Sequence, residues 1–209
     1  MSKYVIFDVD GTLNQTALYA VPAYLSELEK RGIQKSREDI VHCIGMAPHD
    51  IAMTLLGDID KETEMKWRND VKEAESKMII GNAKSFPRMK DVLQSLHEKG
   101  YRTAICSNAY PHHINEVLHN IGLENLFDTI ASLEMGKNKA SVLSSLLSKI
   151  KPEKACLVGD RRFDIEASRV NNIPVIGCLY GYAPEEVKEA TYTVNEPIEI
   201  LDVVEKIFK

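Results

Sequence analysis

The chain lacks the marks of a membrane-spanning, secreted or general nucleic-acid-binding protein. None of the apolar stretches in its 209 residues approaches the ~20 residues that a transmembrane helix needs. No charged-then-apolar leader precedes the first strand-like run. The net charge is −5 and no basic run offsets it, which argues against a nucleic-acid partner. We therefore expect a cytoplasmic protein that binds neither membranes nor nucleic acid.

Cysteine is scarce and dispersed. The four cysteines are far apart in the sequence, and three of them fall in predicted buried strands (Cys106, Cys156 and Cys178), while Cys43 does not. This spacing is typical of reduced core thiols and argues against a disulfide frame or a zinc site. The chain also lacks internal repeats and low-complexity segments. Its length is sufficient for one main domain with a modest insertion.

What the sequence does contain is an apolar strand that ends in two acids. Residues 5–13 read V-I-F-D-V-D-G-T-L, and side chains two apart on a strand point to the same face. Asp8 and Asp10 therefore need a shared proton, a cation or a turn that separates their charges. An exposed acidic turn and a calcium loop are the alternatives. An EF-hand loop needs a closing glutamate about twelve positions along, whereas the next acid here is Glu27.

A second apolar strand, at residues 155–158, also ends in an acid. It continues as G-D-R-R-F-D, with Asp160 directly after the glycine and Asp164 at the end of the motif. In an open parallel sheet, sites lie outside the carboxyl ends of the strands. We therefore expect Asp8, Asp10 and Asp160 to meet across one crevice. Oxygen donors of this kind suit Mg²⁺, which prefers a few carboxylates, several waters and a phosphate.

Two further segments offer groups that would hold a phosphoryl group. The strand at residues 102–106 ends in Ser107 and Asn108, which bind a phosphoryl oxygen without adding charge, although ordinary strand-to-loop turns contain the same residues. Lys139 opens a helical pattern over residues 139–150, where its ammonium would face a phosphate. A solvated lysine is the alternative, and Lys137 is the nearby competitor.

The remaining pattern predicts a split α/β core. After the strand at residues 4–9, only helical patterns follow as far as residue 81, at 17–31, 37–43, 49–56 and 60–78. Farther on, helices at 89–99, 114–121, 139–150, 163–171 and 198–208 alternate with strands at 102–106, 129–131, 155–158 and 174–178. Alternation of this kind is typical of βαβ units, which form a parallel sheet with right-handed crossovers.

Together these motifs resemble a known family. D-V-D-G-T-L, S-N-A, the lysine before a helix and G-D-R-R-F-D are similar, in order and position, to the four motifs of the haloacid dehalogenase superfamily. L-Y-G-Y-A-P-E-E, at residues 179–186, is similar to a segment of its phosphoglycolate phosphatase and β-phosphoglucomutase-like branch. The resemblance implies a Rossmann-like parallel-sheet core flanked by helices (residues 1–16 and 82–209). It also implies an inserted all-helical cap (residues 17–81) that closes over the site.

The resemblance further implies an enzyme, a Mg²⁺-dependent phosphomonoester hydrolase that acts on a small phosphorylated metabolite. In the family pattern Asp8 attacks phosphorus and forms an aspartyl-phosphate, and Asp10 carries the proton for the leaving oxygen. The metal ligands would be Asp8, the backbone carbonyl of Asp10, and Asp160. Lys139 and Ser107 would bind the phosphoryl oxygens and spread their charge.

Other residues would support this set or choose the substrate. Asp164 and Asn108 would lie next to the catalytic groups and fix their orientation. Asn108 is also expected to contact the substrate. Met46 and His49 fall in a loop of the helical insertion, where related enzymes present specificity residues. We expect these two side chains to touch the substrate, with a purely structural loop as the alternative.

Several conspicuous residues have an ordinary interpretation. We expect His112 and His113 to be solvated histidines at a helix start, since adjacent helical residues point in different directions, with a place at the cleft rim close to Ser107 as the alternative. Arg161 and Arg162 are expected in surface ion pairs, with contact to an anionic substrate as the alternative. Tyr180 and Tyr182 are expected to pack against the protein, and Trp67 is expected in a contact between helices, with a contact between subunits as the alternative.

Two departures from the family pattern leave the substrate open. Gln15 stands where many relatives have an acid, and Ala109 stands where many have lysine. A phosphomutase of the β-phosphoglucomutase type uses the same motifs but favours basic residues facing the cleft, and those of the insertion have spacings typical of solvated faces. A regulatory protein on this scaffold would usually lack the nucleophile or a metal ligand, and each such position is filled. We expect a monomer or a homodimer.

Overall fold

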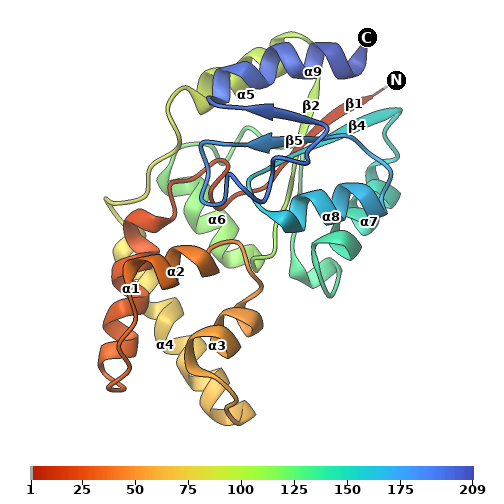
Figure 1. The fold of residues 1–209 in the computed structure, drawn as a ribbon. Coiled ribbons are helices and arrows are strands. Elements are labelled where there is room, and N and C mark those ends of the chain that lie inside the picture. Colours follow the sequence, from red (N-terminus) through yellow and green to blue (C-terminus); the bar gives the residue numbers. More distant parts are fainter. Residues whose placement is uncertain (1) are drawn as a thin grey trace.

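The computed structural model describes residues 2–209, which form a six-stranded parallel sheet with helices on both faces (Figure 1). The strand order is β3-β2-β1-β4-β5-β6, and every neighbouring pair is parallel. The strands are β1 (Lys3–Phe7), β2 (Arg102–Cys106), β3 (Thr129–Ala131), β4 (Lys154–Gly159), β5 (Val175–Cys178) and β6 (Tyr192–Val194). Because β1 lies between β2 and β4, the carboxyl ends of these three strands meet at one edge.

The central strand β1 is buried on both faces, which explains its nearly unbroken apolar sequence. Val5 and Phe7 pack in a cluster with α5, α6 and α9 on one face. Tyr4 and Ile6 pack on the other face, against α7 and α8. These helices are α5 (Met89–Glu98), α6 (Pro111–Asn120), α7 (Lys139–Ile150), α8 (Arg162–Val170) and α9 (Ile200–Phe208). Since side chains alternate along a strand, one short segment supplies both layers of the core.

The segment between β1 and α5 is helical and has an apolar cluster of its own. Its helices are α1 (Ala17–Glu29), α2 (Arg37–Cys43), α3 (Pro48–Leu56) and α4 (Lys61–Ile79). Figure 1 shows them gathered at one end of the sheet, away from the two chain termini. Trp67 of α4 is buried in this cluster, and its ring meets Tyr24 of α1 with centroids 5.7 Å apart. The expected contact of Trp67 between helices is confirmed.

The predicted fold class, a parallel-sheet α/β core flanked by helices with a helical insertion, is confirmed. The sequence prediction missed β6, a three-residue strand whose first two residues are exposed, so no apolar run marks it. Two single 3₁₀ turns, η1 (Leu133–Met135) and η2 (Pro197–Glu199), precede α7 and α9. Among residues 2–209, no helix has the length and apolar character needed to cross a membrane.

Candidate active site

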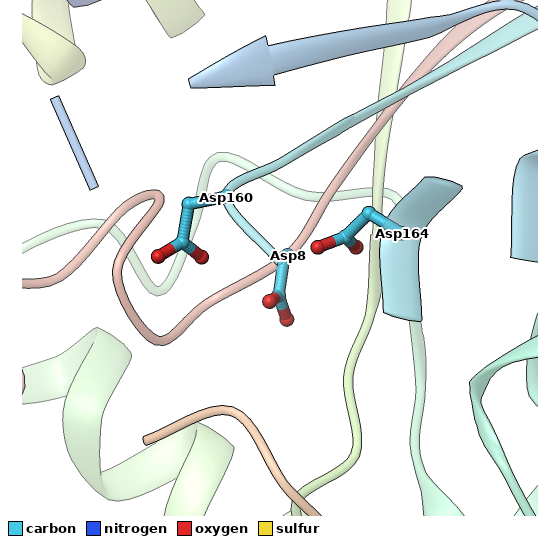
Figure 2. Close-up of side chains that lie close together, drawn as sticks. All are labelled: Asp8, Asp160 and Asp164. Atoms are coloured by element: carbon cyan, nitrogen blue, oxygen red, sulfur yellow. The ribbon is translucent and has the colours of Figure 1, made fainter. Parts of the chain in front are cut away.

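Three buried carboxylates lie together at the carboxyl edge of the sheet. Asp8 follows β1, Asp160 follows β4, and Asp164 lies in the first turn of α8. One oxygen of each lies within 4.8 Å of the others, and Figure 2 shows Asp8 between the other two. The sequence grouped the Asp10 side chain with Asp8 and Asp160. In the structure Asp164 completes the cluster instead, while the carboxylate of Asp10 faces other groups.

Close backbone approach at two glycines makes room for Asp160. At Gly11 φ is +78°, and a Cβ there would lie 2.2 Å from Asp160 Oδ2. At Gly181, in the loop after β5, a Cβ would lie 2.2 Å from Asp160 Cβ. The backbone N of the next residue, Tyr182, donates a hydrogen bond to Asp160 Oδ2 at 2.8 Å. The L-Y-G-Y segment therefore closes over the aspartate, a role that sequence reasoning missed.

Lys139, at the start of α7, supplies positive charge to the cluster. Its Nζ is 2.7 Å from Asp8 Oδ2 and 2.7 Å from Asp164 Oδ1, and its side chain is only 3% exposed. Burial lowers the pKa of Lys139, but the carboxylates of Asp164 and Asp8 outweigh burial and raise this pKa above its usual range. The ammonium therefore stays charged. The competitor considered from sequence, Lys137, is exposed.

The charge balance of the cluster fits a divalent cation. Burial raises the pKa of Asp8 well above its usual range; Lys139 opposes this effect, and Asp164 and Asp160 add to it. Burial likewise raises the pKa of Asp160 to about 7. One ammonium contacts a cluster of three carboxylates, so their ionised forms need further positive charge. Hard oxygen donors at this spacing are suitable ligands for an ion such as Mg²⁺.

The carboxylate of Asp10 faces a different set of groups. Thr16 Oγ1 donates a hydrogen bond to Asp10 Oδ1 at 2.6 Å, and His113 Nε2 lies 3.7 Å from the same oxygen. Burial raises the pKa of Asp10, but His113 and Thr16 outweigh burial, so this pKa is lowered. Burial lowers the pKa of His113, but Asp10 outweighs burial and raises this pKa to about 9. The proton of the pair therefore lies on His113.

The expectation of solvated histidines is wrong for His113. Its side chain is 17% exposed, whereas the adjacent His112 is exposed as expected. The physical reason is the position of α6, which begins just after the carboxyl end of β2. Its first turn therefore lies at the edge of the sheet where the acids gather. The short interval between the apolar strand and Pro111 was the signal available in the sequence.

Ser107 and Asn108 lie where they were expected, at the end of β2 beside the acids. Both line the same cavity as Asp8, and both are buried. Asn108 also makes a contact that the sequence did not indicate, because its Nδ2 donates a hydrogen bond to the backbone oxygen of Gly45 at 3.1 Å. Gly45 belongs to the helical segment, so Asn108 joins the sheet to it.

Residues 5–178 match the family described as haloacid dehalogenase-like hydrolase. The chain belongs to this family. Its relatives include phosphoglycolate phosphatase of Haemophilus influenzae, 31% identical over 196 residues that cover 86% of this chain and 87% of the relative. Phosphoglycolate phosphatase of Aquifex aeolicus is 26% identical over 213 residues, covering 97% of each. A solved β-phosphoglucomutase of Clostridium difficile shares the fold, with a TM-score of 0.85, 19% identity, and coverage of 100% of this chain and 97% of that one.

These comparisons confirm the predicted family, and with it the expectation of an enzyme of the hydrolase class. In this haloacid dehalogenase-like hydrolase, a cavity of about 340 Å³ separates the acids from the helical segment. Asp8 and Asp10 line it from the core, and Met46 of the helical segment lines it as well. His49 does not line this cavity, because its side chain is 60% exposed and its Nδ1 lies 3.0 Å from Glu64 Oε1. The structure thus brings Met46, and not His49, toward the acids.

Proposed function

We propose that this chain is a Mg²⁺-dependent phosphomonoester hydrolase that acts on a small phosphorylated metabolite through an aspartyl-phosphate. The observation that carries the proposal is the position of Asp8. Its carboxylate lines the cavity, lies 2.7 Å from the ammonium of Lys139 and belongs to the carboxylate cluster. Phosphoryl transfer depends mainly on positioning and charge neutralisation, and this arrangement provides both around a fixed nucleophile.

Asp8, Asp160 and the backbone carbonyl of Asp10 would hold the metal ion. Asp164, which contacts Lys139 at 2.7 Å, would orient the ammonium beside them. Bound Mg²⁺ would offset the charge of the carboxylates and of the phosphoryl oxygens. Asp8 is held by Lys139, and Asp160 by the backbone N of Tyr182, so both carboxylate ligands are in place before an ion binds.

The chain's own residues would perform two displacements. First, a carboxylate oxygen of Asp8 bonds to phosphorus while the bond from phosphorus to the leaving oxygen breaks. Asp10 passes to that oxygen a proton that it receives from His113 across their contact, so Asp10 ends this displacement as a carboxylate. Next, Asp10 takes a proton from the attacking water, the bond between phosphorus and Asp8 breaks, and phosphate leaves. Lys139 and Ser107 would hold the negative oxygens throughout.

We also propose that residues 17–81 act as a cap over this core. The helices α1–α4 have a separate apolar cluster, and they provide the cavity wall that faces the acids. A wall of this kind excludes water from the phosphoryl group and contacts the leaving group. The name helical cap is used below for residues 17–81.

A panel of small phosphate esters, assayed with and without Mg²⁺, tests the proposed function. Phosphoglycolate belongs in the panel because the relatives described above are named for it. We expect phosphate release that needs Mg²⁺, stops with a chelator and is absent from Asp8→Asn. Full activity in metal-free buffer, or wild-type activity of Asp8→Asn, would overturn the proposal.

A phosphomutase is the second candidate, because Arg68 and Lys72 of α4 line the cavity. The sequence had placed these basic residues on solvated faces, whereas a mutase needs them to bind a second phosphate. Arg68 Nη1 lies 3.1 Å from Glu64 Oε1, so part of its charge is used within the helical cap. Conversion of a sugar phosphate to its isomer, with no release of phosphate, would favour this candidate over the hydrolase.

A further inference from the structure

Arg161 is buried, although it was expected at the surface. Its side chain is 2% exposed, whereas the neighbouring Arg162 is exposed. Its Nε lies 3.0 Å from Glu186 Oε2, so the expected ion pair exists, with the arginine side chain buried and the glutamate side chain 20% exposed. The guanidinium also donates hydrogen bonds to the backbone oxygens of His42, at 3.1 Å, and Ile44. Arg161 therefore reaches from the core into the helical cap.

The segment it reaches, residues 42–46, is called the cap loop here, and it is held from two strands. Arg161 stands just beyond the end of β4, and Asn108 just beyond the end of β2. Asn108 Nδ2 donates to the backbone oxygen of Gly45 at 3.1 Å. Since β1 lies between β2 and β4, core side chains bind the cap loop on both sides of β1, the strand that Asp8 follows.

The contact between the cap loop and Arg161 requires a glycine at position 45. Its φ is +88°, and a Cβ at this position would lie 3.1 Å from Arg161 Cγ. A side chain is therefore disfavoured both by the backbone and by the neighbouring arginine. Ile44, Gly45 and Met46 also line the cavity above Asp8. One side of the cap loop rests on Arg161, and the other side faces the space that a leaving group would fill.

Stability alone gives a poor account of the buried guanidinium. Taking Arg161 out of water is costly even with the partly exposed Glu186 beside it, and apolar replacements for such pairs are often equally stable. The guanidinium offers something else, a planar set of donors that fixes the direction of several hydrogen bonds at once. Here those donors bind the backbone oxygen of His42, in the last turn of α2, and that of Ile44, in residues 44–46, which belong to no helix or strand.

We propose that Arg161 is a positioning residue, which holds the cap loop over the cavity and thereby helps to select the leaving group. The inference rests on the proposed function, because a leaving group has meaning only for an enzyme that cleaves phosphate esters. Arg161 acts through the cap loop, since it is not among the described residues that line the cavity. Its removal should weaken contacts with bulky leaving groups and spare the chemistry at Asp8.

Four variants of the full chain test this inference. Arg161→Met removes the donors, and Arg161→Met combined with Glu186→Met removes both charges, so that no buried acid is left unpaired. Arg161→Lys keeps the charge without the planar fork. Arg162→Met is the matched control, because it removes the exposed neighbouring arginine.

Hydrogen exchange of the free protein, followed by mass spectrometry, measures the cap loop directly. In the double variant we expect peptides covering residues 42–48 to exchange about tenfold faster or more, given the usual strength of hydrogen bonds to charged groups. Peptides from β1 and β4 should be unchanged, and Arg162→Met should match the wild type throughout. Unchanged exchange at residues 42–48 in the double variant would overturn the inference, whatever the activity.

Kinetics then separate an effect on the cap loop from an effect on the metal site. The two probes are p-nitrophenyl phosphate, with a bulky leaving group, and acetyl phosphate, with a small one. We expect the ratio of their kcat/KM values to fall about tenfold in the Arg161→Met variants through a higher KM for the aryl ester. For Arg161→Lys we expect a kcat/KM ratio between that of the Arg161→Met variants and that of the wild type. The Mg²⁺ concentration that gives half of the full activity should not change in any of these variants.

If the Arg161→Met variants needed more Mg²⁺ but kept the wild-type ratio of kcat/KM values for the two probes, Arg161 would act on the adjacent Asp160. The inference would then be wrong. If the wild type cleaved no phosphate ester of the panel, the proposed function would fail by itself. The exchange experiment would still decide whether Arg161 holds the cap loop, because it needs no turnover.

Discussion

The imidazole of His113 and the carboxylate of Asp10 form a largely buried pair, with Nε2 3.7 Å from Oδ1. Although burial lowers the pKa of His113, Asp10 outweighs this and raises the pKa to about 9. An unfolded histidine has a pKa of about 6.5. The folded state therefore binds this proton more tightly than the unfolded state does. The resulting stability is fully present below about pH 6.5 and is lost as the pH rises through about 9.

His113→Gln should therefore destabilise the protein in a pH-dependent way. We expect a loss of roughly 1–3 kcal/mol in the free energy of unfolding near pH 6, which shrinks toward zero by about pH 10. Urea unfolding of both proteins across this range measures the difference. His112→Gln is the control, because His112 is exposed. Its substitution should leave the pH dependence of the free energy of unfolding nearly unchanged. A constant difference between wild type and His113→Gln would mean that His113 packs as a neutral side chain.

Lys139→Met should weaken both folding and catalysis. The substitution leaves Asp8 and Asp164 buried without their ammonium, and loss of one partner of a buried pair costs about 3–5 kcal/mol. Mg²⁺ should restore part of this stability, since a cation offsets the same charge. Phosphate release should fall by about 10² to 10³, as for other groups that stabilise a developing negative charge.

Thermal unfolding with and without Mg²⁺, together with a phosphate-release assay, checks these outcomes. Lys137→Met is the matched control, because Lys137 is exposed and close in sequence. Equal losses in the two lysine variants would contradict the role given to the contacts of Lys139.

Met46→Ala and His49→Ala should have different effects on specificity, because only Met46 lines the cavity. Loss of the Met46 side chain should change relative kcat/KM values among phosphate esters by about 10-fold, as expected when a pocket contact disappears. His49→Ala should leave the ranking unchanged. The panel of esters measures both variants. A uniform loss across all esters in Met46→Ala would show that this side chain supports the cap loop without contacting leaving groups.

The meeting of Asp8 and Asp160 was predictable because local pattern and topology agree. Each aspartate follows an apolar run long enough for a strand, and parallel strands bring their carboxyl ends to one edge. The side-chain direction of Asp10 was not predictable in the same way. The two-residue alternation holds only within β1, which ends at Phe7, and the turn at Gly11 sets the direction beyond it.

The remaining features depend on contacts between distant segments, which leave no local pattern. Gly181 approaches Asp160 only because the loop after β5 folds back over the end of β4. His113 reaches Asp10 only because α6 begins at the same edge of the sheet. Arg161 looks like a surface residue in sequence, and its burial follows from the position of the helical cap. Sequence reasoning recovers what a strand end dictates and misses what a tertiary contact adds.

Asp8 and Asp10 should have separable roles in the reaction. Asp8→Asn should abolish turnover, because an amide does not form the phosphoryl intermediate. Asp10→Asn keeps its backbone carbonyl, and so a proposed metal contact, but removes the group that passes the proton. Loss of general acid–base catalysis typically costs about 10² to 10⁴ in rate. The loss should be larger for alkyl esters, whose leaving oxygen needs a proton, than for p-nitrophenyl phosphate, whose leaving group departs without one.

The second displacement should also slow in Asp10→Asn, because the attacking water loses the group that accepts its proton. With p-nitrophenyl phosphate the first displacement would then outpace the second, so phosphate should accumulate on Asp8. Rapid-quench experiments with phosphate-labelled substrate measure the covalent intermediate, and Asp8→Asn provides the blank. Equal rate losses for good and poor leaving groups, with no trapped phosphoenzyme, would leave Asp10 a purely structural role. In that case its contacts with Thr16 and His113 would serve only to hold the loop after β1.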